Sequence, residues 1–151
     1  MKTLRLFPLE LGRLLRSRLT WLVMLLTVLG PVVGLYLYQS AVSTMNSLYL
    51  ANPAIAGGIA GGILFGLLAI LELDRACRSR VDVLVDAVVS PLTAALTRLS
   101  ALLTTAVLTT TLTMLVWLPI SAGLIGAVFD MVDYVLAYLL FMGLALSLIH
   151  I

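Results

Sequence analysis

The chain has very little charge for its length. Of its 151 residues only 11% are Asp, Glu, Lys or Arg, whereas 62% are hydrophobic. A soluble domain averages about 25% charged residues, because its surface must face water. The scarcity of charge therefore excludes an ordinary soluble domain and indicates a membrane protein.

Cysteine and histidine are almost absent. The chain has one of each, Cys77 and His150, so the sequence allows no internal disulfide and suggests no metal cluster. It also lacks a Walker A phosphate-binding loop, a histidine-rich ligand set and a nucleophile beside a base. The sequence therefore predicts that the chain is not an enzyme and needs no cofactor, and that any ATP hydrolysis belongs to another subunit.

What the chain does have is long apolar runs. A helix of about 20 apolar residues spans a bilayer core. The runs predict an all-α, polytopic membrane protein with four transmembrane helices, at about residues 19–38, 54–73, 99–119 and from 132 to at least 145. An amphipathic N-terminal interfacial helix completes the predicted fold.

The basic residues gather in two patches on alternate connections. The first patch is Lys2, Arg5, Arg13, Arg16 and Arg18, and the second is Arg75, Arg78, Arg80 and Arg98. Cytoplasmic loops retain Lys and Arg, so we expect a multi-pass protein of the cell membrane with a cytoplasmic N-terminus. The connections at about 39–53 and 129–133 would then lie outside. So few basic residues, all flanking spans, argue against nucleic-acid binding.

Residues 1–18 carry apolar residues at helical spacing, namely Leu4, Phe7, Leu11, Leu14 and Leu15. Arg13 and Arg16 lie off that stripe, and Pro8 suits the first turn of a helix with Glu10 near its positive end. We expect this helix at the membrane surface, with leucines in the acyl boundary and arginines toward lipid phosphates. The alternative is a flexible basic tail that only sets topology.

Small residues crowd the second predicted span. Its glycines overlap as small-xxx-small pairs, which let helix backbones approach closely in lipid, and they are Gly57, Gly58, Gly61, Gly62 and Gly66. We interpret them as helix-packing positions. A substrate-lining surface is the alternative.

Three features near the third and fourth spans need interpretation. Six threonines, Thr104, Thr105, Thr109, Thr110, Thr111 and Thr113, either bond their own helix carbonyls, which we favour, or line a polar path. Residues 120–129 either extend the third span or form a re-entrant stretch. Asp130 and Asp133 form an acidic turn, which lacks the further ligands that a metal or catalytic site needs.

The segment 74–98 between the second and third spans mixes acids and arginines. Asp82 and Asp86 share one face of a predicted short helix, opposite several valines and a leucine. Ser90-Pro91 then predicts a new helix, because Ser caps helices and Pro suits their first turn. The simpler interpretation is a solvated loop with ion pairs among Asp74, Arg78 and Asp82.

This order of elements resembles the membrane subunit of an ABC-2-type (type V) ABC transporter. The resemblance rests on the basic segment 11–19 (LGRLLRSRL) before the first span, and on a connection that starts at 72–75 (ELDR) and ends at 90–92 (SPL). Arg98 matches the basic residue that often precedes the third span. In that family residues 1–18 would be a connecting helix, and 74–98 would hold a coupling helix.

The resemblance implies a permease subunit, working as an exporter, whose partners are an ATP-binding cassette ATPase, a second permease copy or homologue, and the lipid bilayer. The residues implied at the ATPase contact are Arg78, Arg80, Asp82, Asp86, Ser90 and Pro91. The alternatives are a secondary transporter or channel, which would want an ionisable residue inside a span, and a non-transporting membrane scaffold.

The last six residues, 146–151, resemble the translation of a sequencing adapter. The alternative is ordinary apolar membrane helix. On the adapter interpretation the native chain continues beyond Ala145 and His150 carries no function. Such permeases usually have six spans, so two would then follow those predicted here.

Overall fold

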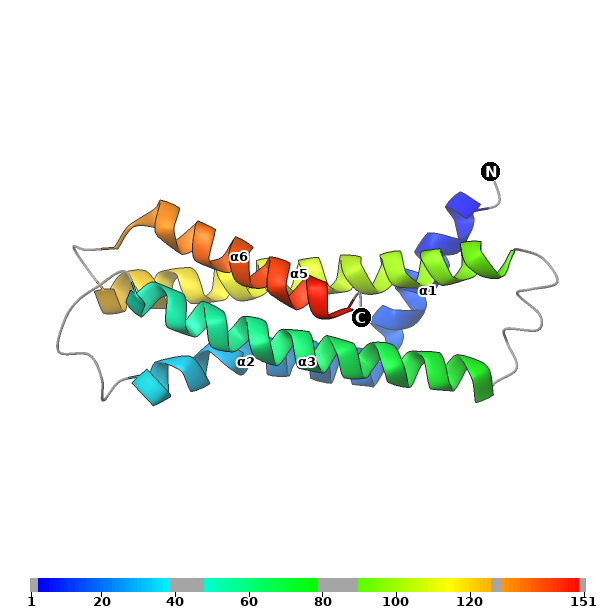
Figure 1. Cartoon of the computed structure of the whole chain (residues 1–151), viewed down its shortest axis with the longest axis horizontal. Coiled ribbons are helices and arrows are strands. Elements are labelled where there is room, and N and C mark those ends of the chain that lie inside the picture. The colour runs from blue at the N-terminus through cyan, green and yellow to red at the C-terminus, as the bar shows by residue number, and fades with distance from the viewer. Residues whose placement is uncertain (1–2, 39–47, 79–89, 126–128, 150–151) are drawn as a thin grey trace.

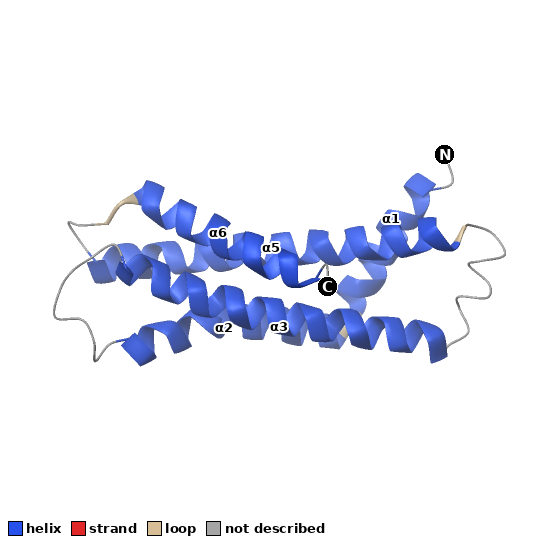
Figure 2. Ribbon diagram, viewed as in Figure 1, coloured by secondary structure: helices blue, strands red, loops and turns tan. Residues whose placement is uncertain are grey.

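A computed structural model describes residues 3–38, 48–78, 90–125 and 129–149, and for some of these the backbone only. These residues form five helices: α1 (Thr3–Arg16), α2 (Arg18–Tyr38), α3 (Leu48–Arg78), α5 (Pro91–Ile125) and α6 (Met131–Ile149). Four of them run along the long axis of the molecule, and α1 crosses one end (Figure 1). The part of the chain that the structure describes contains no strand (Figure 2), so the predicted all-α class is confirmed.

Three of these helices are long and apolar enough to cross a membrane. They are α2, α3 and α5, over the stretches Arg18–Tyr36, Pro53–Arg75 and Pro91–Gly123. The stretch Met131–Leu140 of α6 is a shorter apolar helix. Large apolar side chains such as Leu25, Ile63 and Leu115 are exposed on the outer faces of these helices. A soluble monomer rarely exposes so much apolar surface, whereas in a membrane lipid tails cover it. The fold therefore indicates a helical membrane protein.

The helices α3 and α5 extend beyond the predicted spans, because a charged or polar residue beside an apolar run does not by itself end a helix. The helix α3 continues through the charged residues 74–78, and α5 starts eight residues before the predicted third span. At the far end α5 continues past Pro119 to Ile125. Residues 120–125 are therefore an extension of the helix, as one of the two interpretations held.

The helix α1 starts earlier than the sequence predicts. It begins at Thr3, so Pro8 lies inside it rather than in its first turn, and Glu10 lies in its middle. The predicted start at Pro8 is wrong, because a proline removes one backbone donor without ending a helix that other contacts hold. Leu14 is buried against α2, α3 and α5, with Phe7 and Leu11 packed beside it. These residues face protein rather than the acyl boundary expected for the leucines.

Glycines bring α2 and α3 into close contact. A Cβ added at Gly57 would lie 3.0 Å from the Pro31 Cγ, and one at Gly61 would lie 3.1 Å from the Thr27 Cγ2. On the other side of the contact, a Cβ at Gly30 would lie 3.1 Å from the Gly57 Cα. Only glycine allows this approach. A Cβ at Gly66 would meet nothing within 4 Å, so this glycine does not make the close approach.

The helix α5 starts where the sequence predicts. The Thr93 backbone N–H donates to the Ser90 Oγ at 3.4 Å, so Ser90 caps a helix whose first residue is Pro91. All six threonines of the predicted span donate their hydroxyls to the carbonyl four residues earlier. The preferred interpretation of these threonines, back-bonding within the helix, is confirmed.

Two clusters form the interior, one toward each end of the bundle. The first joins four helices through Leu14, Val23, Phe65, Leu68, Ala101, Leu102 and Ala106. The second contains Ala54, Trp117, Tyr134, Ala137 and Tyr138. In the second cluster the Trp117 Nε1 donates to the Val28 carbonyl at 2.8 Å, and the Tyr134 hydroxyl donates to the Met114 carbonyl at 2.6 Å. These bonds link α5 to α2 and α6 to α5.

Candidate functional site

Charged side chains from three helices meet at the end of the bundle that α1 crosses. The Arg13 Nη2 lies 3.2 Å from the Glu72 Oε2, and the Arg13 Nε donates to the Glu10 Oε2 at 2.9 Å. The Arg98 Nε lies 3.6 Å from the Glu10 Oε1, and the Arg75 Nη1 lies 3.7 Å from the Glu72 Oε1. We call these five residues the ionic cluster. It connects α1 to both α3 and α5.

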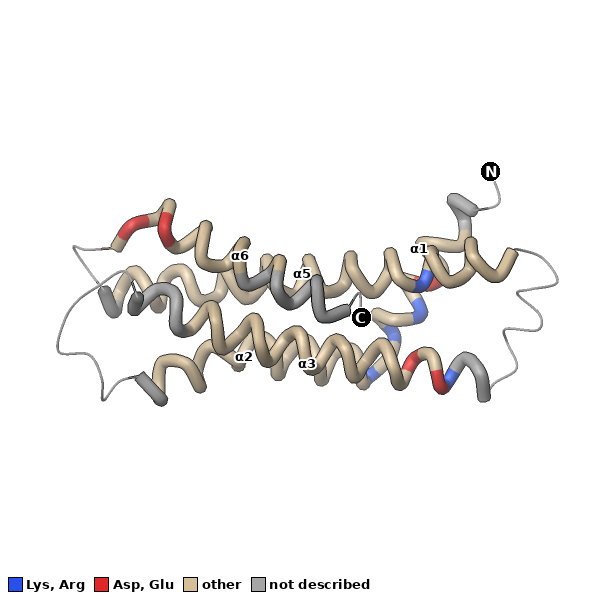
Figure 3. Tube along the Cα trace, in the orientation of Figure 1, with Lys and Arg blue, Asp and Glu red and all other residues tan. Residues whose placement is uncertain are grey.

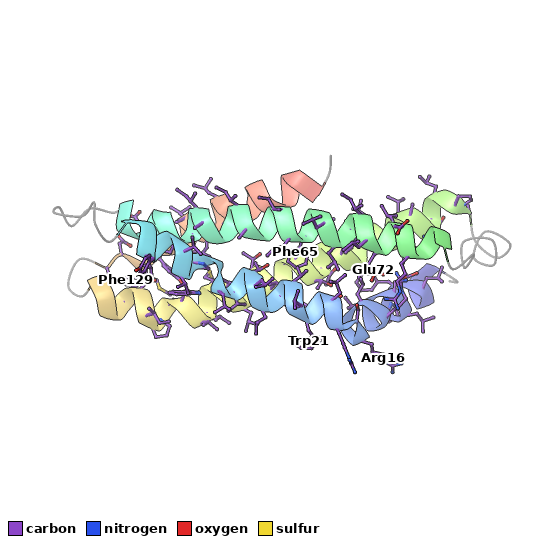
Figure 4. The ribbon with its side chains drawn as sticks, turned by 90° about the horizontal axis from the view of Figure 1, so that it is seen from below. Arg16, Trp21, Phe65, Glu72 and Phe129 are labelled. Atoms are coloured by element: carbon purple, nitrogen blue, oxygen red, sulfur yellow. The ribbon has the colours of Figure 1, made fainter. Side chains whose placement is uncertain are left out.

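The ionic cluster is partly withdrawn from water. The Glu72 side chain is 7% exposed, and those of Glu10 and Arg98 are 20% and 17% exposed, whereas those of Arg13 and Arg75 lie nearer the surface. A buried carboxylate needs a paired charge, and Arg13 supplies it. In Figure 4, Glu72 lies among the helices, while Arg16 extends away from the ribbon. The cluster is thus a link between helices rather than a solvated charge patch.

The helical repeat explains why these charges are inside. Glu72 follows Phe65 and Leu68, two of the most buried residues of α3, at spacings of seven and four, which place all three on one face. In the same way Arg98 precedes the buried Leu102 by four residues, and Glu10 precedes the buried Leu14 by four. Each charge therefore continues the buried stripe of its own helix beyond the apolar cluster.

Charge is segregated along the bundle (Figure 3). Among the charged side chains that the structure describes, the end crossed by α1 holds five arginines and three acids: Arg13, Arg16, Arg18, Arg75, Arg98, Glu10, Glu72 and Asp74. The opposite end holds Asp130 and Asp133. Asp130 accepts the Val132 backbone N–H at 2.7 Å, so it caps α6. We call the first end the basic end.

A groove opens beside the ionic cluster. It is lined by Pro8, Leu9, Gly12, Arg13 and Arg16 of α1, by Ser17 between α1 and α2, and by Arg75 of α3. A second, smaller pocket lies within the cluster and is lined by Glu10, Arg13, Leu14, Ala69, Glu72, Leu73, Arg98 and Leu102. Its polar lining residues all belong to the ion pairs, so we assign it no ligand.

The structure describes only part of the predicted partner contact. Ser90 and Pro91 are exposed at the start of α5, and the backbone of Arg78 ends α3. Arg80, Asp82 and Asp86, with the predicted short amphipathic helix, lie outside the described residues. Of the predicted packing glycines, Gly57 and Gly61 face α2 at the close contact, Gly62 is buried, Gly58 is half-buried, and Gly66 has open space around it.

The ionic cluster differs from what the sequence predicts. The sequence pattern places Glu10 at a helix start and Arg13 toward lipid phosphates, and it assigns Glu72 only to the charged segment. The spacing from Phe65 and Leu68 to Glu72 was a usable signal, because it puts a carboxylate on the apolar stripe. Its arginine partner lies on another helix, and no local spacing in a sequence reveals such a partner.

The described residues contain no group of three or more His, Cys, Asp or Glu side chains that could hold a metal ion. What the cluster offers is mechanical, since ion pairs hold α1 against the two helices that lead into and out of segment 79–89. Comparison of the chain with protein-family models, curated proteins and solved structures finds no match.

Proposed function

We propose that this chain is the membrane-spanning permease subunit of an ABC transporter, working as an exporter, which couples to a separate ATPase through the segment between α3 and α5. The single observation that carries the proposal is the position of the ionic cluster. Arg75 lies in the last turn of α3, Arg98 lies in the second turn of α5, and both are joined to α1 through carboxylates. The two helix ends that flank segment 79–89 are thus tied to a third helix.

This arrangement suits a subunit that receives force from a partner. A protein that pushes on segment 79–89 moves the ends of α3 and α5, and the charged contacts pass that movement to α1. Arg78, Arg80, Asp82 and Asp86 would set the register of the partner, while the valines between them would supply apolar contact. Ser90 and Pro91 would fix where the rigid helix begins.

The proposal also includes the topology. Lys and Arg remain on the cytoplasmic side of membrane proteins, and the described arginines gather at the basic end (Figure 3). The basic end would therefore face the cytoplasm, with α1 as an interfacial connecting helix. On this proposal α6 is the fourth span, and the subunit works as a dimer with a second permease copy.

The test is co-purification of the protein with an ATP-binding cassette ATPase encoded by a neighbouring gene. The variant Asp82→Arg with Asp86→Arg reverses charge in the proposed contact, and we expect it to abolish association and ATPase stimulation. The matched control, Asp130→Arg with Asp133→Arg, makes the same charge reversal at the opposite end of the bundle and should leave association intact. If the first variant retains both association and stimulation, this contact is wrong.

A second candidate is a secondary transporter, which the near-complete burial of Glu72 favours, because a buried carboxylate in a membrane protein is often an ion or proton site. Its pairing with Arg13 argues for a structural role instead. Transport by the chain alone in proteoliposomes, driven by a pH gradient and lost in Glu72→Gln, would favour this candidate over the permease.

A further inference from the structure

The groove at the basic end is lined by three arginines and by no acidic residue. Five of its residues belong to α1 and fall on one helix face, because they recur at spacings of three and four: Pro8, Leu9, Gly12, Arg13 and Arg16. Ser17 and Arg75 complete the lining. The groove therefore lies between one face of α1 and the last turn of α3.

A glycine produces the hollow. Gly12 lies between Pro8 and Arg16 on the lining face, and a Cβ placed on it would meet no atom within 4 Å. The space that a side chain would fill is thus open, between two arginines of the same face, Arg13 and Arg16. Glycine is not needed here for helix packing, since nothing approaches it.

The arginines that line the groove have donors for a further acceptor. The Arg75 side chain is 71% exposed, and its contact with the Glu72 carboxylate is 3.7 Å long. A guanidinium carries five N–H donors, so this one contact leaves most of them to another group. Arg16 is exposed and extends away from the ribbon (Figure 4). The nearby acids Glu10 and Glu72 are already engaged within the ionic cluster.

Large apolar side chains are exposed on α1 and at the start of α2. Leu9, which lines the groove, is 69% exposed, and Trp21 and Leu22 of α2 are 58% and 54% exposed. The Trp21 indole N–H donates to the Leu15 carbonyl at 2.7 Å, which holds the ring against the last turn of α1. Tryptophan rings favour the headgroup level of a bilayer.

From this combination we propose that the groove binds the headgroup of an anionic phospholipid. The phosphate lies between Arg16 and Arg75, and the acyl chains lie along Leu9 and Trp21. An acidic protein segment would satisfy the arginines but leave this apolar surface uncovered, whereas a lipid covers both. The proposal needs the chain to be in a membrane, and it goes beyond the proposed function because it requires no ATPase.

The experiment uses Trp21 as a reporter in the full chain. The chain has two tryptophans, so Trp117→Phe leaves Trp21 alone. This variant is reconstituted into phosphatidylcholine vesicles that contain brominated phosphatidylglycerol or brominated phosphatidylcholine at equal mole fraction, and Trp21 fluorescence is measured. We expect stronger quenching by the brominated phosphatidylglycerol, and a loss of about fivefold in its relative association constant for Arg16→Gln and for Arg75→Gln.

Two further variants separate the groove from general electrostatics. Arg18→Gln removes the same charge close to Trp21 but outside the groove lining, so it should retain the preference. Gly12→Leu fills the hollow without changing charge and should reduce the preference. Circular dichroism of each variant checks that its helices are intact.

Equal quenching of the parent by both lipids would overturn the proposal, and so would an equal loss for Arg18→Gln and Arg16→Gln. Displacement of the quenching lipid by soluble inorganic phosphate would also overturn it, in favour of a free anion. Because none of these measurements involves the ATPase, a failure here leaves the co-purification result unaffected.

Discussion

Arg13 on α1 and Glu72 on α3 are joined by an ion pair of 3.2 Å between the Nη2 and Oε2 atoms. The carboxylate is almost completely enclosed, while the guanidinium reaches the surface. This pair holds α1 against the bundle in addition to the apolar contact that Leu14 makes. A helix that would otherwise lie loosely on a membrane surface is thereby part of the helix bundle.

A double-mutant cycle measures this link. Arg13→Gln and Glu72→Gln should each lower the free energy of unfolding in detergent micelles, and the double variant should lose less than the sum. We expect a coupling free energy of about 1 kcal/mol, at the low end for a buried pair because Arg13 is partly exposed to water. The control cycle pairs Glu72→Gln with Arg16→Gln, whose effects should add. Additivity in both cycles would contradict an Arg13–Glu72 link.

Two glycine-to-alanine changes separate packing from helix propensity. In Gly57→Ala the new methyl group would lie 3.0 Å from the Pro31 ring, so α2 and α3 must move apart, and we expect a loss of about 1–3 kcal/mol. In Gly66→Ala the methyl group meets open space, and alanine favours helix by up to about 1 kcal/mol. Thermal denaturation of the two variants in micelles should shift in opposite directions. A shift of the same sign and size would show that no close contact exists at Gly57.

The Tyr134 hydroxyl links α6 to α5 through the Met114 carbonyl at 2.6 Å. Tyr134→Phe keeps the ring contacts with Phe129 and Tyr138 but removes this donor. Hydrogen bonds between membrane helices contribute about 0.6 kcal/mol on average, so we expect a loss of about that size. Tyr36→Phe is the matched control, since Tyr36 is among the most exposed side chains of α2. Chemical denaturation in micelles compares them, and equal effects of the two changes would contradict a role for the hydrogen bond.

The sequence predicted the helices well where apolar length and capping decide them. The apolar run of α2 and the Ser90-Pro91 start of α5 agree with the structure within a residue. Helix boundaries that rest on weaker sequence signals differ between the prediction and the structure. Thr3 rather than Pro8 begins α1, because Phe7 and Leu11 pack against the bundle and hold the helix through the proline.

The candidate site was less predictable for a physical reason. Three of the five members of the ionic cluster have a local signal, since Glu10, Glu72 and Arg98 all continue buried stripes. Which carboxylate meets which arginine depends on how α1 crosses the bundle end, and that crossing follows from the packing of four helices around Leu14. Long-range packing of this kind leaves no pattern in a single helix.

The proposed coupling depends on the basic end facing the cytoplasm, and cysteine labelling tests this most directly. In a Cys77→Ser background, Arg75→Cys places a thiol at the basic end and Asp133→Cys places one at the opposite end, both at exposed positions. A membrane-impermeant maleimide added to intact cells should label the second variant only, and label the first after the membrane is permeabilised. Labelling of Arg75→Cys in intact cells, with protection of Asp133→Cys, would contradict the account.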